Sequence, residues 1–112
     1  MMITVQKVID SLPVKAVAGS DFSKKITGGY VSDLLSNVMG QAKADSVWIT
    51  MQIHQNVAAV SLLAGLSAVI IAGGMKPDKA LIDKANEEDL AILVTDEPTY
   101  EITGRLYELG IK

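Results

Sequence analysis

The residues of this chain that could do chemistry are few, and most of them follow apolar segments of strand length. The only histidine, His54, lies in a polar run over residues 52–56. The glycine pairs Gly28-Gly29 and Gly73-Gly74 could bring backbone N–H groups close to an anion. Neither pair belongs to a Gly-x-x-x-x-Gly-Lys-Ser/Thr loop or a Gly-x-Gly-x-x-Gly fingerprint. These residues therefore indicate a binding site and no defined reaction.

The composition excludes several classes of chemistry. The chain has 112 residues, no cysteine and one histidine, which argues against a disulfide framework, a thiolate metal site, a cysteine nucleophile and an all-protein transition-metal site. The formal net charge is -3, and the ten lysines and arginines form no basic stripe for a phosphate backbone. We therefore expect no metal, no cofactor and no nucleic-acid partner.

One stretch has the length and character of a membrane span. Residues 47–75 contain no Asp, Glu, Lys or Arg, and a transmembrane helix needs about 20 apolar residues. The polar run 52–56 and the glycines at 65 and 73–74 divide this stretch into strand, helix and strand, buried in a core. The first residues carry no secretory signal pattern. We expect a cytoplasmic protein without a membrane partner.

Apolar periodicity predicts alternating helices and strands over one domain, residues 1–112. The first half shows a helix over 5–12 capped by Thr4, a strand over 14–18, a polar loop over 19–29, a helix over 30–42 and a strand over 47–51. The second half shows a helix over 57–63 capped by Asn56, a strand over 68–72, a helix after Pro77, a strand over 91–94 and a last helix capped by Thr95 or Asp96 and ended by Gly110. The expected fold is α/β, with a mostly parallel sheet of four strands or slightly more and helices on both faces.

The order of these elements predicts where a ligand would bind. Ligands of open parallel sheets bind outside the carboxyl ends of the strands. Four segments follow predicted strands and should meet there: residues 19–21, 52–56, 73–74 and 95–96. The loop over residues 26–30 should lie at the same edge. His54 could equally be a structural hydrogen-bonding residue, and Thr95 and Asp96 could be helix caps.

Four segments carry a resemblance to a known family. They are residues 25–36 with Thr27-Gly28-Gly29, residues 48–56, residues 71–78 and residues 100–107. Together they resemble the stand-alone DRTGG-domain proteins, which are similar to the N-terminal domain of HPr kinase/phosphorylase. The resemblance implies an HPr kinase N-terminal-domain-like α/β regulatory domain, often at a dimer interface, with no established reaction. Kinase activity is not expected, since no P-loop is present.

The resemblance and the strand ends together give one set of candidate ligand-binding residues. None of them is expected to be catalytic or to bind a metal. The set is Thr27, Gly28, Gly29, Asp33, Gln52, His54, Asn56, Gly73, Gly74 and Thr95.

Three functional hypotheses follow. The first is a non-catalytic regulatory module that self-associates and binds a small anion such as a nucleotide or phosphometabolite, with a protein partner in a signalling or metabolic-regulation system. The second is a dimerisation or assembly domain without a ligand, which the mean hydropathy of +0.31 favours. The third is a small enzyme that uses His54 as acid or base with Asp33 or Asp96.

Overall fold

Three strands with unbroken apolar runs form the middle of the sheet in a computed structural model, which describes residues 2–112. They are β5 (Ser46–Thr50), β6 (Ala68–Ile71) and β7 (Ala91–Val94), and all their residues but the last of β7 are buried. A strand in the middle of a sheet covered on both faces has no solvent side, which is why these runs are continuous rather than alternating.

Two further strands flank these three. The order of the five-stranded sheet is β2-β7-β6-β5-β4, where β2 is Lys15–Ala18 and β4 is Gly28–Val31. The strands β4 to β7 are parallel to one another, and β2 is antiparallel to β7. A separate antiparallel pair joins β1 (Ile3–Thr4) and β3 (Lys25–Ile26). The prediction of a mostly parallel sheet is confirmed, with one strand more than four.

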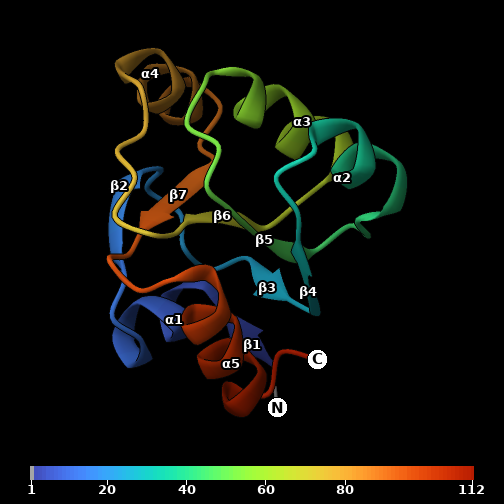
Figure 1. Ribbon diagram of the computed structural model, residues 1–112, viewed down its shortest axis with the longest axis vertical. Coiled ribbons are helices and arrows are strands. Elements are labelled where there is room, and N and C mark those ends of the chain that lie inside the picture. The colour runs from blue at the N-terminus through green and yellow to red at the C-terminus, as the bar shows by residue number, and fades with distance from the viewer. Residues whose placement is uncertain (1) are drawn as a thin grey trace.

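Helices cover both faces of the sheet (Figure 1). One face carries α1 (Val5–Ser11) and α5 (Thr99–Leu109), whose buried residues share a core with Ile49, Ile70 and Leu93. The other face carries α2 (Leu35–Gln41), α3 (Asn56–Ala64) and α4 (Lys79–Glu87), which pack around Trp48 and Ile71. The sheet thus separates two apolar cores, as the predicted layers require.

The helix ends agree only in part with the capping predictions. Thr4 caps α1, and its side chain accepts a hydrogen bond from the N–H of Lys7 at 3.2 Å. Gly110 ends α5 in the left-handed conformation. Asn56, predicted as a cap, is instead the first residue of α3. The α5 cap position belongs to Pro98, so the prediction of Thr95 or Asp96 there was wrong.

The segment predicted as a polar loop followed by a long helix is built differently. Residues 19–29 include β3 and the first half of β4, and α2 begins at Leu35 rather than at Tyr30. Tyr30 and Val31 belong to residue types that favour a strand, and here they pair with the fully buried β5. Tertiary pairing therefore overrides the helical spacing that begins at Tyr30.

Within residues 2–112, no helix has the length and apolar character needed to cross a membrane. Residues 47–75 form β5, α3 and β6, as the polar and glycine interruptions predicted.

Candidate functional site

The carboxyl ends of the four parallel strands meet at one edge of the sheet. Behind them lie Asp33, the run 52–56, Gly73-Gly74 and Thr95. Because β2 runs in the opposite direction, its start at Lys15 also lies at this edge, opposite Val94. The prediction is confirmed for the run 52–56, for Gly73-Gly74 and for Thr95, whereas Asp33 was predicted within a helix.

Two predicted members of this edge lie at the opposite one. Gly28 pairs with Ser46, so Thr27-Gly28-Gly29 stands where β4 and β5 begin. The N–H of Thr27 donates to the carbonyl of Asp45 at 2.9 Å. Residues 19–21 follow the antiparallel β2 and also lie at the amino edge. The placement of both segments was wrong, because Gly28-Gly29 forms a strand and β2 is reversed.

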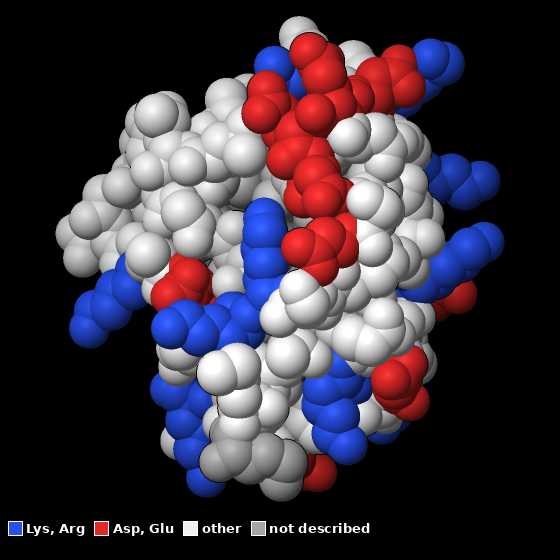
Figure 2. Space-filling view, turned by 180° about the vertical axis from the view of Figure 1, so that it is seen from behind, with Lys and Arg blue, Asp and Glu red and all other residues white. Residues whose placement is uncertain are grey.

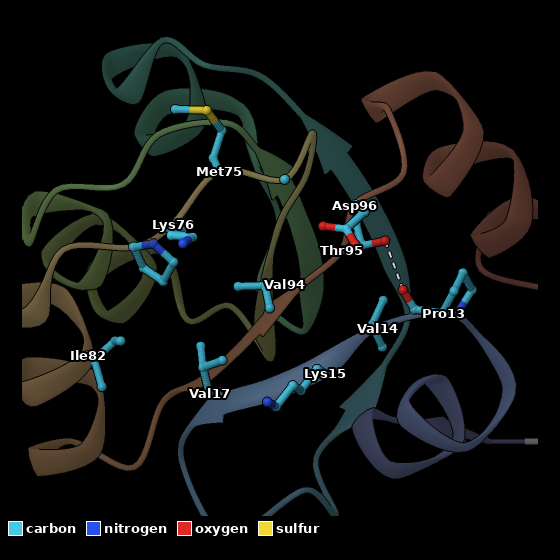
Figure 3. A pocket seen from close by; sticks show the side chains of 12 residues that line it. Pro13, Val14, Lys15, Val17, Met75, Lys76, Ile82, Val94, Thr95 and Asp96 are labelled. Atoms are coloured by element: carbon cyan, nitrogen blue, oxygen red, sulfur yellow. Dashed lines mark hydrogen bonds between the residues drawn. The ribbon is translucent and has the colours of Figure 1, made fainter.

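A cavity of about 630 Å³ opens at the carboxyl edge (Figure 3). It lies between the start of β2, the end of β7 and the loop from β6 to α4. Apolar side chains form much of its wall, among them the half-buried Val17, Ile82 and Val94. Its volume falls within the range of about 300 to 1,000 Å³ usual for small-molecule sites.

The charged residues of the cavity come from three different segments. Lys15 lies on β2, Lys76 on the loop before α4, and Asp96 after β7. Figure 3 shows the two lysines on different walls, with Val17 and Val94 between them. An ammonium group on each of two walls beside an apolar surface suits a ligand with an anionic part and a flat apolar part.

Gly74 and Thr95 shape this cavity. Gly73 and Gly74 have φ values of +73° and +71°, and their N–H groups donate to the carbonyls of Glu97 and Thr95. The buried hydroxyl of Thr95 donates to the Pro13 carbonyl at 2.8 Å and so joins the ends of β7 and β2. The glycine N–H groups are engaged within the protein, so their role here is to turn the chain.

Asp33 joins the ends of β4 and β5. Its carboxylate accepts hydrogen bonds from the Thr50 hydroxyl at 2.8 Å and from the Met51 N–H at 2.7 Å. The side-chain amide of Gln52 donates to the Asp33 carbonyl at 2.9 Å. Asp33 and Gln52 therefore hold two neighbouring strand ends together, and neither lines the cavity described above.

His54 pairs with a different carboxylate from the two that the enzyme hypothesis named. Its Nδ1 lies 2.7 Å from Asp78 Oδ2; the His54 side chain is largely exposed and the Asp78 side chain is about half exposed. The Asp78 N–H also donates to the carbonyl of Ile53. The pair thus links the loops before α3 and α4. His54 and the exposed Asn56 lie outside the lining of the 630 Å³ cavity.

Residues 7–109 match the family model of the DRTGG domain. The chain belongs to the DRTGG-domain family. The sequence resemblance placed Ser23-Lys24 where the family has its Asp-Arg pair, but the two residues directly before Thr27-Gly28-Gly29 are Lys25-Ile26. The five residues that give the family its name therefore stand here as Lys25-Ile26-Thr27-Gly28-Gly29. In this DRTGG domain they form β3 and the start of β4, at the edge of the sheet away from the cavity.

A solved structure is similar to this DRTGG domain over most of its length. It is the crystal structure of the CBS and DRTGG domains of the regulatory region of Clostridium perfringens pyrophosphatase, complexed with its activator, diadenosine tetraphosphate. The TM-score is 0.74 at 16% sequence identity, and the match covers 90% of this chain and 44% of that one. The DRTGG domain thus spans less than half of that chain, and the likeness shows the fold. No curated protein matches the sequence significantly.

The sequence predictions missed Lys15 and Lys76. Both stand next to prolines or apolar residues in segments that looked like ordinary strand and helix boundaries. Lys76 stands two residues after Gly74, the last residue of the predicted 73–74 segment, so its position could have been found from the strand ends. Lys15 could not, because only the reversed direction of β2 brings its start to this edge.

A carboxylate clamp holds the amino edge of the DRTGG domain. Asp89 Oδ1 accepts hydrogen bonds from the Ser20 N–H at 2.7 Å and from the Ser20 hydroxyl at 3.0 Å. The Asp21 N–H adds a third contact at 3.3 Å. These hydrogen bonds favour the charged form and lower the pKa of Asp89 below its ordinary value of 3.8. The clamp ties the loop after β2 to the turn before β7.

The substitution Asp89→Asn is expected to reduce stability more at neutral pH than in acid. A lowered pKa in the folded state stabilises the fold above the unfolded value of 3.8, and this contribution is lost as the pH falls through the folded pKa. Urea unfolding of wild type and variant at neutral pH and at about pH 2.5 checks this. The difference should shrink in acid. Asparagine is chosen because it tolerates the φ of +53° at this position, so the substitution adds no backbone strain. A stability difference of equal size at both pH values would contradict the clamp.

Proposed function

We propose that this DRTGG domain is a non-catalytic regulatory module that binds a small anionic ligand, of the nucleotide or phosphometabolite class, in the carboxyl-edge cavity. The observation that carries the proposal is the cavity itself, with Lys15 and Lys76 on separate walls and an apolar surface between them. The apolar wall suits a base or another flat group, and the ammonium groups suit phosphate oxygens.

The comparisons support the regulatory part of this proposal. The family is one of regulatory domains, and the similar pyrophosphatase region was crystallised with a nucleotide activator, diadenosine tetraphosphate. A ligand that spans the cavity would contact both β2 and the loop before α4. A ligand that contacts both segments binds more tightly to the conformation in which they are close together, and this difference in affinity is what a regulatory change requires.

The absence of catalysis is part of the proposal, with a specific argument. Asp78 orients His54, which could in principle serve as an acid or base, but both side chains are exposed to solvent at 64% and 45%. Neither lines the cavity that would hold a substrate. General acid–base catalysis needs the group within hydrogen-bond reach of the substrate. We therefore propose that the His54–Asp78 pair links two loops.

Self-association is a further part of the proposal, together with one domain formed by residues 1–112. Two large apolar side chains beside the same small hollow are exposed away from the cavity, Val31 at 47% and Tyr107 at 59%. Contiguous exposed apolar surface commonly marks an interface. A protein partner of the regulatory system would bind the assembled module.

Thermal unfolding against a ligand panel tests the proposed function. The panel holds ADP, ATP, diadenosine tetraphosphate, glucose 6-phosphate, acetyl phosphate and inorganic phosphate, and the fluorescence of the single, buried Trp48 reports unfolding. A ligand at about 100 times its Kd adds about 2.7 kcal/mol, which shifts the melting temperature on the order of 10 °C. At least one nucleotide should give such a shift. A panel without any shift would overturn the ligand-binding proposal.

A further inference from the structure

The two margins of the sheet differ in how they are protected. At one margin, β2 carries Lys15 and an irregular register between Ala16 and Ala18. Both a lysine and a bulge are devices that keep an edge strand from pairing with another chain. At the other margin, β4 has the uncharged sequence Gly-Gly-Tyr-Val, a regular register and no proline. Among residues 2–112, no strand covers its outer side.

The unpaired backbone groups of β4 can be assigned from its hydrogen bonds to β5. The N–H of Ser32, just past the strand, donates to the carbonyl of Ile49 on β5. Alternate residues of a strand direct their N–H and C=O groups to the same side. Gly28 and Tyr30 therefore face β5, and Gly29 and Val31 direct their backbone groups to the open margin.

A second cavity lies beside this margin, on the face that α5 covers. It holds about 180 Å³ and is lined by Gly29 and Val31 from β4, by Ile49 from β5, by Leu106 and Tyr107 from α5, and by Ile111 and Lys112 after α5. The lining also includes the α5 residue Thr103, whose buried hydroxyl has no hydrogen-bond partner among the described residues. A buried hydroxyl without a hydrogen-bond partner, in a largely apolar hollow beside an open strand, indicates that a further group binds here.

We propose that a second copy of this chain pairs with β4 in antiparallel orientation, on a two-fold axis that passes beside Tyr30. In this register Gly29 lies opposite the partner's Val31, and the same contact repeats on the other side of the axis. Each such pair exchanges two backbone hydrogen bonds, so both outward-facing residues of each copy are satisfied. The two sheets become one continuous sheet. This inference rests on the self-association proposed above and names its interface.

The strand sequence favours a second copy as the occupant. Gly29 has no side chain, and a Cβ at this position would be in ordinary van der Waals contact with Ile111 and Val47 at 3.7 Å, so the space over Gly29 admits a small apolar group. The side chain of the partner's Val31 would lie over that space, on the cavity side. The strand itself carries no charge, so its residues oppose their copies without like-charge repulsion, although each chain has a net charge of -3 and Lys112 lies beside the hollow.

A competing face lies on α2 and α3. Neither helix contains a charged residue, and Figure 2 shows their lobe without blue or red atoms, whereas acidic side chains gather over the neighbouring part of the molecule. Leu34 and Leu63 are exposed there at 63% and 76%. These helices satisfy their own backbone hydrogen bonds, so this face lacks the unmet groups that β4 presents. It is the control surface for the experiment.

Sedimentation velocity of the full chain from micromolar to sub-millimolar concentration tests the interface. The wild type should dimerise, and Val31→Lys should raise the dissociation constant at least about tenfold, because a lysine protects an edge strand. The matched control Leu63→Lys places the same charge on the α3 face and should dimerise like the wild type. A monomeric wild type, or dissociation by Leu63→Lys and not by Val31→Lys, would overturn the inference.

A cross-linking pair tests the register. The chain contains no cysteine, so Gly29→Cys and Val31→Cys introduce the only thiols. Paired residues of this kind have Cα atoms about 5.5 Å apart, within disulfide range. Mixing the two variants under mild oxidation should give a mixed dimer in much higher yield than either variant alone. Equal yields in all three reactions would contradict the register. Nucleotide-induced melting shifts are read separately, so failure of ligand binding and failure of this interface can be told apart.

Discussion

Gly19→Ala is expected to destabilise the fold by about 3 kcal/mol, a large share of the 5 to 15 kcal/mol typical of a domain. Gly19 has a φ of +89°, and a Cβ there would lie 2.9 Å from the Leu90 carbonyl oxygen and 3.0 Å from Ala91 Cα. Both obstacles are backbone atoms, which cannot rotate away. The left-handed conformation costs roughly 1 to 2 kcal/mol and the overpacking roughly 1 to 3 kcal/mol.

The matched control is Gly104→Ala. Gly104 lies in the interior of α5, and nothing stands within 4 Å of its added Cβ. Alanine should stabilise the helix by up to about 1 kcal/mol. Urea unfolding of both variants measures the two effects with opposite signs. A Gly19→Ala variant as stable as the wild type would show that the loop after β2 does not pack against the start of β7 as described.

The double variant Lys15→Glu/Lys76→Glu is expected to weaken nucleotide binding about 100-fold, measured with the nucleotide of the panel that gives the largest melting shift. Each lysine contributes a charge-assisted contact worth about 1.5 kcal/mol, and each 1.4 kcal/mol changes affinity tenfold. Both side chains are exposed, and neither forms an ion pair among the described residues, so the fold should persist. Isothermal titration of the nucleotide into each protein gives the affinities.

Lys43→Glu is the control for this charge reversal. Lys43 is also exposed but lies just before β5 begins, at the amino edge of the sheet. The Lys43→Glu substitution changes the net charge by the same amount as each of the two cavity substitutions. It should leave the affinity for the nucleotide within about twofold of the wild type, since distant surface charges are screened by salt. Equal weakening by Lys43→Glu would mean that the nucleotide responds to the overall charge, and the cavity would lose its support.

The arrangement of helices on both faces of a parallel sheet could be predicted because buried positions carry apolar residues, which are visible in the sequence. The runs that became β5, β6 and β7 contain consecutive apolar residues, which is the pattern of strands in a parallel sheet that is covered on both faces. Thr4 and Gly110 were recognised as helix ends for equally local reasons, a side-chain acceptor and a left-handed turn. The placement of Gln52 at the carboxyl edge followed from the same topology. Asp33 did not follow from it, because residues 30–42 were predicted as one helix and the strand β4 before Asp33 was missed.

The remainder depended on contacts that local patterns do not encode. The direction of β2 is a tertiary property, and it decides that Lys15 lies at the cavity and residues 19–21 do not. Gly28-Gly29 looked like a loop because glycine disfavours strands, yet pairing with the buried β5 holds it extended. The cavity is therefore lined mainly by residues outside the predicted set, with Gly74 and Thr95 as the shared members.

The location of the bound nucleotide decides the central claim most directly. Hydrogen exchange of backbone amides, measured with and without the nucleotide that gives the largest melting shift, maps the segments that become protected. We expect protection of the amides over residues 14–17, 74–76 and 94–96, the segments that carry most lining residues of the carboxyl-edge cavity. Protection confined to Thr27-Gly28-Gly29 at the amino edge would contradict the account and place the ligand at the residues that give the family its name.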